Sequence, residues 1–281
     1  MKPRAAAPTP PLPEGPPWSL PMGEAPFVFF DLEMTGLDPA RDRIVEVCAE
    51  RVRGGVVEAR LASLVNPPER AGGAAEIHGL DAAALAGAPP FTAIADELLR
   101  LFEGAIPVAH ATAWDMAFLE AELARAGHET ALPHYLDTLL LARRAFAFPR
   151  YSLEALCSEL HLSVERFHRA EGDVLALRQV FARCVEVLAP VSPRDLWEVR
   201  IGERRARAAI VDACEAAAKH AAPVQLVYRP SRKPPEPLVM VVQEVRSDLD
   251  PPRVLGYLLP GRGRRELRAD RILRVEPGPS A

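Results

Sequence analysis

The chain has 281 residues, of which 49% are hydrophobic and 26% charged, and this composition is typical of a globular protein with one large domain and a smaller one. No run of about 18 apolar residues is present to span a bilayer, and the N-terminus lacks the apolar segment of a secretory signal, so we expect a cytoplasmic protein with no membrane partner. Residues 1–190 carry 17 Lys and Arg against 26 Asp and Glu, whereas residues 191–281 carry 17 against 12. An acidic first part that suits cation binding therefore precedes a basic second part.

The four cysteines are spread along the chain. Cys48, Cys157, Cys184 and Cys214 form no CxxC pair and lie among apolar residues, so neither a zinc site nor a disulfide framework is supported. We expect them to be reduced thiols in a hydrophobic core.

Residues 1–26 are rich in Pro and Ala, a composition that does not pack a core and that prefers extended, solvated conformers. The pattern predicts a flexible leader. The segment PPLPEGPP (residues 10–17) also fits a polyproline docking ligand, but a plain tail is the preferred interpretation.

Residues 27–36 (FVFFDLEMTG) are an apolar run that ends in two carboxylates one residue apart. Because side chains alternate across a strand, Asp31 and Glu33 project from the same face at the end of a predicted strand. Two acids held this close repel each other unless a cation lies between them, and such oxygen ligands suit Mg²⁺ or Mn²⁺. The pair predicts half of a metal site, although an ordinary strand end with solvated acids has the same pattern.

Further strands and helices follow in a regular order. Residues 43–52 and 56–65 alternate apolar and polar residues around Gly54 and Gly55, which predicts a hairpin. Sequential strands followed by alternating strands and helices indicate an α/β fold with a mixed sheet. The later elements are expected as helices at 81–85 and 92–102, a strand at 106–109, a helix at 114–125, a strand at 135–136, helices at 137–146 and 153–160, and a long amphipathic helix with Asp173 near its start and Leu188 near its end.

The prolines at 190 and 193 indicate a domain boundary. Residues 195–218 are rich in Arg and Ala and are predicted to be mostly helical. Strands are expected at 223–228, 238–245, 253–259 and 266–275, the last with a break near Ala269. We therefore divide the chain into a leader (1–26), a first domain (27–189), a linker and helix (190–218) and a small, mostly antiparallel β domain (219–281).

Four acids and one histidine lie where strands end or helices begin. Asp31, Glu33, Asp115 and Asp173 would repel one another strongly, so their convergence requires divalent metal. Two metal ions about 3.5–4 Å apart can hold both the attacking water and the leaving oxygen of an in-line phosphoryl displacement. His168, five residues before Asp173, is suited to accept a proton because the usual histidine pKa of about 6.5 lies near working pH.

Several motifs occur in the order found in one enzyme family. The chain contains DLEMTGLDPARDRIVEV (residues 31–47), AHATAWDMAFLEAEL (109–123) and HRAEGD (168–173), together with the connecting segments EIHGLDAAALAGAPPF, LDTLLLARRAF and YSLEAL. Over residues 27–188 it resembles the DEDDh family of 3′ to 5′ exonucleases, which includes the proofreading subunit of bacterial replicative DNA polymerase, RNase T and oligoribonuclease. The resemblance implies an RNase H-like mixed sheet flanked by helices and a single-stranded nucleic acid 3′ end as substrate.

The resemblance also implies a role for each motif residue. Asp31, Glu33 and Asp173 would hold one Mg²⁺ or Mn²⁺ ion, Asp31 would bridge to a second ion, and Asp115 would complete the acidic set, with His168 as the general base. The terminal nucleotide would be held by the backbone of Met34, Thr35 and Gly36, by the side chain of Leu37, and by His110 and Trp114.

Two residues depart from the family pattern. Ala111 replaces the usual Asn, so a polar contact near the substrate is lost, whereas Trp114 replaces the usual Phe and keeps an aromatic ring. His110 matches the family, but a structural histidine that is hydrogen-bonded at a strand end is the preferred interpretation.

The second domain has a weaker resemblance. LVYRP (residues 226–230) and VLGYLLPGRGRRELRADRILRVEP (254–277) resemble the WYL domain, a small SH3-like barrel attached to many bacterial regulators and nucleic-acid enzymes, although the Trp-Tyr-Leu tripeptide is missing. This domain could bind nucleic acid or a small ligand, or it could simply present an Arg-rich edge with Asp270 in a structural ion pair. The candidate phosphate contacts are Arg262, Arg264, Arg265, Arg268 and Arg271.

The sequence thus favours a metal-dependent 3′ to 5′ exonuclease that acts on single strands, with DNA preferred over RNA, as a stand-alone repair or processing enzyme rather than a polymerase subunit. The alternative is a non-catalytic nucleic-acid-binding or ligand-sensing regulator that uses the basic domain.

Overall fold

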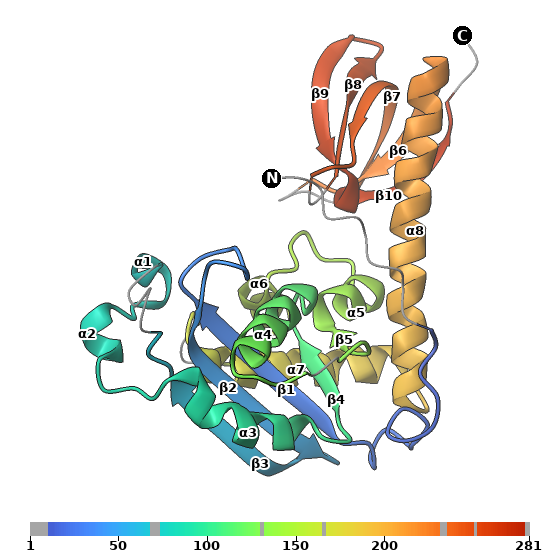
Figure 1. Ribbon diagram of the computed structural model, residues 1–281. Coiled ribbons are helices and arrows are strands. Elements are labelled where there is room, and N and C mark those ends of the chain that lie inside the picture. The colour runs from blue at the N-terminus through green and yellow to red at the C-terminus, as the bar shows by residue number, and fades with distance from the viewer. Residues whose placement is uncertain are drawn as a thin grey trace. The chain divides into compact units, whose positions relative to one another are not determined.

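The computed structural model describes residues 11–67, 74–129, 132–164, 167–230, 235–249 and 252–278. The chain divides after Arg200 into an N-terminal and a C-terminal unit, each with its own sheet (Figure 1). No helix in these ranges is long and apolar enough to cross a membrane.

The N-terminal unit contains a five-stranded sheet in the order β3-β2-β1-β4-β5. β1 pairs with β2, and β2 with β3, in antiparallel fashion, whereas β1 with β4 and β4 with β5 are parallel, so the mixed sheet is confirmed. The β2–β3 turn uses Gly54 and Gly55, both at positive φ, as a tight hairpin requires. The strands are β1 (Phe27–Met34), β2 (Ile44–Arg53), β3 (Val56–Leu64), β4 (Ile106–Ala109) and β5 (Leu136–Asp137).

Helices lie on both sides of this sheet. The expected helices are present, and α1 is an additional single turn that ends at Gly79, with φ 73°, too short to leave a periodic signal. The helices are α1 (Ala75–His78), α2 (Ala82–Leu85), α3 (Phe91–Phe102), α4 (Ala113–Arg125), α5 (Thr138–Ala145), α6 (Leu153–Glu159) and α7 (Ala170–Leu188).

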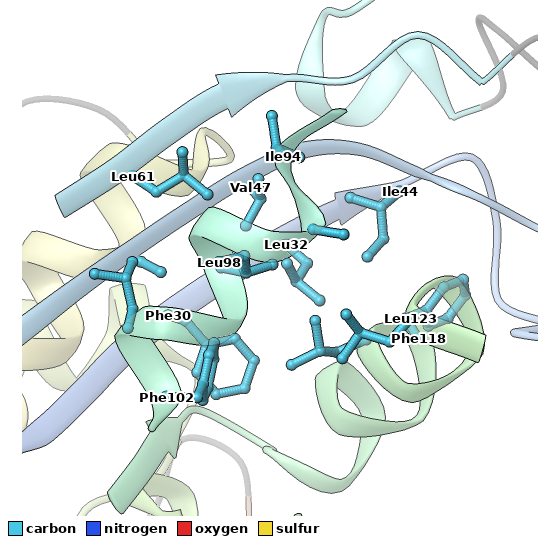
Figure 2. Close-up of a cluster of buried hydrophobic side chains, with 14 of the residues drawn as sticks. Phe30, Leu32, Ile44, Val47, Leu61, Ile94, Leu98, Phe102, Phe118 and Leu123 are labelled. Atoms are coloured by element: carbon cyan, nitrogen blue, oxygen red, sulfur yellow. The ribbon is translucent and has the colours of Figure 1, made fainter. Parts of the chain in front are cut away.

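The alternation along β1 decides which side chains face which helix. Val28, Phe30 and Leu32 point into a core that is covered by α3 and α4, as Figure 2 shows for Phe30 and Leu32. Phe27 and Phe29 point to the other face, where their rings lie 5.3 and 5.1 Å from the ring of Phe181 on α7. Since residues two apart share a face, Asp31 and Glu33 belong to the α7 side of the sheet.

Residues 11–26 differ from the solvated segment that their composition predicted. The ring of Trp18 lies 5.6 Å from that of Trp197 and 6.0 Å from that of His134, and only 7% of Trp18 is exposed. The Met22 N–H also donates to the carbonyl of Val191. The side chain of Trp18 therefore packs this part of the leader against the N-terminal unit. Residues 1–10 lie outside the described residues.

The C-terminal unit combines a helix with a second five-stranded sheet. α8 (Pro193–His220) starts in the N-terminal unit and continues into this one, where Cys214 joins the core of the sheet. The strands are β6 (Pro223–Tyr228), β7 (Glu236–Arg246), β8 (Arg253–Leu259), β9 (Gly263–Arg268) and β10 (Ile272–Pro277), antiparallel in the order β10-β6-β7-β8-β9.

Two predictions about this unit are refined. The break expected near Ala269 is a 3₁₀ turn, Ala269–Arg271, that divides the predicted last strand into β9 and β10. The predicted barrel is not closed in the described residues, because β9 and β10 form the two edges and do not pair with each other.

The cysteines are as expected. All four, which lie in the described part of the chain, are free thiols with at most 2% exposure. Burial raises the pKa of each thiol, to about 12 for Cys48 and Cys184, which keeps them protonated and unreactive.

Candidate active site

Three of the predicted acids meet at the end of β1. Asp31 and Glu33 point to the α7 side of the sheet, and Asp173 lies in the first turn of α7. One carboxylate oxygen from each residue lies within 4.8 Å of the other two. Oxygen-only ligands this close together suit a hard divalent cation such as Mg²⁺ or Mn²⁺, so the residues present fit the metal that the motifs imply.

Asp115 approaches this cluster from the opposite side of β1. β4 runs parallel to β1, so their carboxyl ends share one edge of the sheet, and α4 begins a few residues after β4. Asp115 is 7% exposed. After burial, its charge contributes most to raising the pKa of Asp31. The structure therefore brings all four predicted acids to one edge of the sheet.

The acids strongly perturb one another. Burial raises the pKa of Asp31 well above its ordinary value, and the charges of Asp115 and Asp173 raise it further. Burial, followed by the charges of Asp173 and Glu46, raises the pKa of Glu33 from 4.5 to about 7. The pKa of Asp115 is also raised, by burial and then by Asp137. Without a bound cation this cluster opposes folding at neutral pH.

This cluster predicts an unusual pH dependence when metal is removed. A carboxyl group whose folded pKa is raised stabilises the fold below its ordinary pKa, and this stabilisation is lost as the pH rises through the folded pKa. For Glu33 the interval runs from 4.5 to about 7. The melting temperature of the chelator-treated protein should therefore fall between about pH 5 and pH 8, and added Mn²⁺ should restore most stability at the upper end. Differential scanning fluorimetry measures the melting temperature as a function of pH, and Glu33→Gln should flatten this dependence. A melting temperature of the chelator-treated protein that rises over this pH interval would contradict the prediction.

His168 is exposed and lies two residues before the start of α7. It adopts the left-handed conformation, with φ 60°, which is uncommon for a residue other than glycine and is frequent at functional sites. Burial raises the pKa of Asp173, and the neighbouring His168 together with hydrogen bonds from the backbone of His168 and Arg169 acts in the opposite direction. The predicted base thus lies beside the predicted metal ligand, open to solvent.

The loop after β1 is built around Asp42. A Cβ atom on Gly36 would come within 2.5 Å of the Asp42 carboxylate, which accepts a hydrogen bond from the Asp38 N–H at 2.8 Å. The absence of a side chain at Gly36 therefore makes room for the Asp42 carboxylate. Thr35 is buried, and its hydroxyl accepts from the Arg43 N–H at 3.0 Å.

The remaining predicted substrate residues separate into two groups. Leu37 is 75% exposed and Trp114 is 41% exposed, so both apolar side chains are available to a ligand, and Met34 is half-buried. Both ring nitrogens of His110 are hydrogen-bonded within the protein, to Thr138 Oγ1 at 3.0 Å and to the carbonyl of Tyr151 at 2.8 Å. His110 therefore has the contacts of the structural histidine that was the preferred interpretation.

Ala111, at the position where the family has Asn, adopts φ 64°. A left-handed conformation costs a non-glycine residue roughly 1–2 kcal/mol, and Asn tolerates it better than Ala. Because Ala111 is exposed, Asn fits, and Ala111→Asn should raise the free energy of unfolding by about 0.5–1 kcal/mol. Urea denaturation measures this, with Ala113→Asn in the first turn of α4 as a destabilising control; a less stable Ala111→Asn protein would contradict the backbone argument.

Two acidic residues of the site were not predicted. Glu46 lies opposite Glu33 in the β1–β2 register, and Asp137 accepts hydrogen bonds from the N–H groups of Ala111 and Leu139 at 3.1 and 3.0 Å. Asp137 is the last residue of a strand, much as Asp31 and Glu33 lie near the end of β1, and this position was the available signal. Glu46 lies in mid-strand, where its sequence context gives no indication.

In the C-terminal unit the arginines are not equivalent. Arg268 forms two hydrogen bonds, at 3.0 and 2.9 Å, with Asp270, whose side chain is 6% exposed, so this pair matches the structural alternative. Arg264 and Arg265 are exposed on β9, where Arg264 pairs with Tyr257 of β8 in the sheet register. Arg262 is exposed in the turn between β8 and β9, while Arg271 ends the 3₁₀ turn.

A mixed sheet with an acidic cluster at the end of its first strand is the arrangement of a nuclease domain. The family model described as Exonuclease (RNase T) matches residues 28–181, more than half of the chain, so the chain belongs to this exonuclease family. It is 34% identical over 179 residues to the PolC-type DNA polymerase III of Thermotoga maritima, and 31% identical over 182 residues to the 3′-5′ exonuclease DinG of Bacillus subtilis. Among solved structures, exonuclease I of E. coli in complex with a dT13 oligonucleotide superposes with a TM-score of 0.55 at 17% identity.

These matches cover limited parts of longer proteins. The alignments span 63% and 64% of this chain but only 13% of the polymerase and 20% of DinG. The exonuclease I match covers 83% of this chain and 55% of the other. The chain therefore matches less than a quarter of the length of either sequence relative.

Proposed function

We propose that the protein is a metal-dependent 3′ to 5′ exonuclease that shortens single-stranded nucleic acid, with DNA preferred over RNA. The observation that carries this proposal is the convergence of Asp31, Glu33 and Asp173, whose oxygens lie within 4.8 Å of one another. Membership of the exonuclease family supports the activity, and the DNA enzymes among the relatives support the preference for DNA.

In this proposal the acids and the histidine have separate tasks. Asp31, Glu33, Asp173 and Asp115 hold two Mg²⁺ or Mn²⁺ ions, which when bound offset the negative charge that develops on the phosphate. His168 accepts the proton of the attacking water, and its exposed position beside Asp173 leaves room for the incoming strand.

In this proposal the exposed apolar residues position the substrate. Leu37 and Trp114 offer apolar surface to the terminal base, and the backbone of Met34, Thr35 and Gly36 lies beside the metal ligands. We assign no substrate contact to His110, whose ring nitrogens are already hydrogen-bonded.

For the C-terminal unit we propose a small WYL-like domain with an SH3-like sheet that binds the nucleic-acid strand or a small ligand. The return of β10 to pair with β6 supports this architecture. The exposed arginines Arg262, Arg264 and Arg265 support phosphate binding. A non-catalytic regulator that relies on this domain is the rival function.

The decisive experiment uses single strands of DNA and RNA labelled at either end, with Mg²⁺, Mn²⁺ or chelator. We expect a ladder of shortened products from 5′-labelled DNA and release of a labelled mononucleotide from the 3′ label, both dependent on metal. Faster cleavage of RNA would reverse the substrate preference. Binding without any metal-dependent shortening would overturn the nuclease function and favour the regulator.

A further inference from the structure

Glu46 and Arg169 form an ion pair beside the acidic cluster, and the proposed reaction gives neither residue a task. Arg169 Nε lies 3.0 Å from both carboxylate oxygens of Glu46, and its Nη2 donates to Oε1 at 2.7 Å. Glu46 also accepts a hydrogen bond at 3.1 Å from the N–H of Ala170, the first residue of α7. One carboxylate therefore joins β2 to the beginning of α7.

The position of this pair relates it to the active site. Glu46 lies directly opposite Glu33 across the β1–β2 register, and its side chain is 9% exposed. The charge of Glu46 already acts on the neighbouring acids, and without a partner it would repel them more strongly or draw the cation away from them. Arg169 instead occupies the oxygens of Glu46, because a guanidinium binds a carboxylate with two parallel hydrogen bonds.

The same pair controls the backbone that carries two site residues. Arg169 directly follows His168, and its carbonyl accepts the N–H of Asp173 at 3.0 Å. A shift of Arg169 would therefore move His168 and Asp173 together, while Asp31 and Glu33 stay on β1.

We propose that Glu46 and Arg169 are a positioning pair, which holds the first turn of α7 against β2 and so sets the distance of His168 and Asp173 from the acids of β1. The kinetic consequence of this pair rests on the proposed nuclease function, but the metal-binding consequence does not.

The chain offers a matched control for an ordinary structural ion pair. Arg178 and Glu50 also join α7 to β2, at 2.7 Å, with side chains that are 24% and 13% exposed, against 27% and 9% for Arg169 and Glu46. Arg178 lies nine residues further along α7, away from its first turn. Loss of either pair removes an Arg–Glu contact between the same two elements, and each glutamate keeps a second partner: Glu46 the N–H of Ala170 at 3.1 Å, and Glu50 the side chain of Arg60 at 3.5 Å. Of the two pairs, the one with Glu46 adjoins the acids.

The experiment compares Arg169→Gln with Arg178→Gln in the full chain, by calorimetric titration with Mn²⁺ and by the kinetics of single-stranded DNA cleavage. We expect Arg169→Gln to weaken Mn²⁺ binding and to lower kcat, each by roughly 10- to 100-fold, which is the range found when residues that orient metal ligands are removed. KM should change less than about threefold. Arg178→Gln should stay within about twofold of wild type in both measurements, and Arg169→Lys should fall between.

Equal losses in the two Gln variants, or wild-type Mn²⁺ affinity in Arg169→Gln, would overturn the positioning role. A wild type that binds Mn²⁺ but cleaves nothing refutes the nuclease function alone, and the Mn²⁺ affinities then decide the role of the pair. If Arg169→Gln does not fold, Arg169→Lys is compared with Arg178→Lys by the same criteria.

Discussion

Replacing Asp31 with Asn should lower 3′-end hydrolysis by at least about a thousandfold, a loss of about 4 kcal/mol of transition-state stabilisation, while making the chelator-treated protein more stable. Asp31 is surrounded by the other acids, and both burial and their charges raise its pKa. Asn keeps the shape of the side chain but removes the charge, so a proposed metal ligand is lost and the apoprotein is relieved of repulsion among its acids.

Activity and melting temperature are measured on the same samples. Each kcal/mol of added stability raises the melting temperature by about 2–4 °C in a domain of this size. Asp96→Asn is the control, because the side chain of Asp96 is 81% exposed on α3 and should leave both quantities unchanged. A chelator-treated Asp31→Asn protein that is less stable than wild type would show that the acids are not under electrostatic strain.

His168→Asn should lower kcat by about 10²- to 10⁴-fold, the usual contribution of a general base, and should leave Mn²⁺ affinity nearly unchanged. Asn is chosen because it tolerates the left-handed backbone at this position better than Ala does, so the test removes the base without adding backbone strain. Single-turnover cleavage measures the chemical step, and calorimetry measures the metal.

His161→Asn is a close control, since His161 is exposed, has φ 54° and lies after α6. It should keep wild-type activity. If His168→Asn retains more than about a tenth of kcat, another group must accept the proton, and the assignment of the base would have to be abandoned.

The site was predictable where local chemistry is encoded in short spacings. Asp31 and Glu33 could be placed on one face because strands repeat every two residues, and Phe27 and Phe29 pack against α7 as that period requires. The hairpin at Gly54 and Gly55 and the end of β4 could also be predicted from the sequence, since both depend on local patterns. These elements bring the four acids to one edge of the sheet.

The features that sequence alone did not reveal depend on contacts between distant residues. Glu46 and Arg169 are 123 positions apart, and nothing near Glu46 marks it as different from Glu50. The sequence marked the Gly36 backbone as a contact of the terminal nucleotide, but it gave no indication that the Asp42 carboxylate fills the space beside this glycine. The 3₁₀ turn at Ala269–Arg271 appeared only as a break, since three residues carry no periodic signal.

Packing of Trp18 against Trp197 and His134 has a practical consequence for dissecting the protein. The family match begins at residue 28, so a fragment that starts there would lack Trp18 and would lose one of the groups that cover the indole of Trp197. Uncovered apolar surface of this kind favours self-association and precipitation. A fragment that starts at residue 11 retains the cover, and is the better starting point for crystallisation or spectroscopy of the isolated nuclease unit.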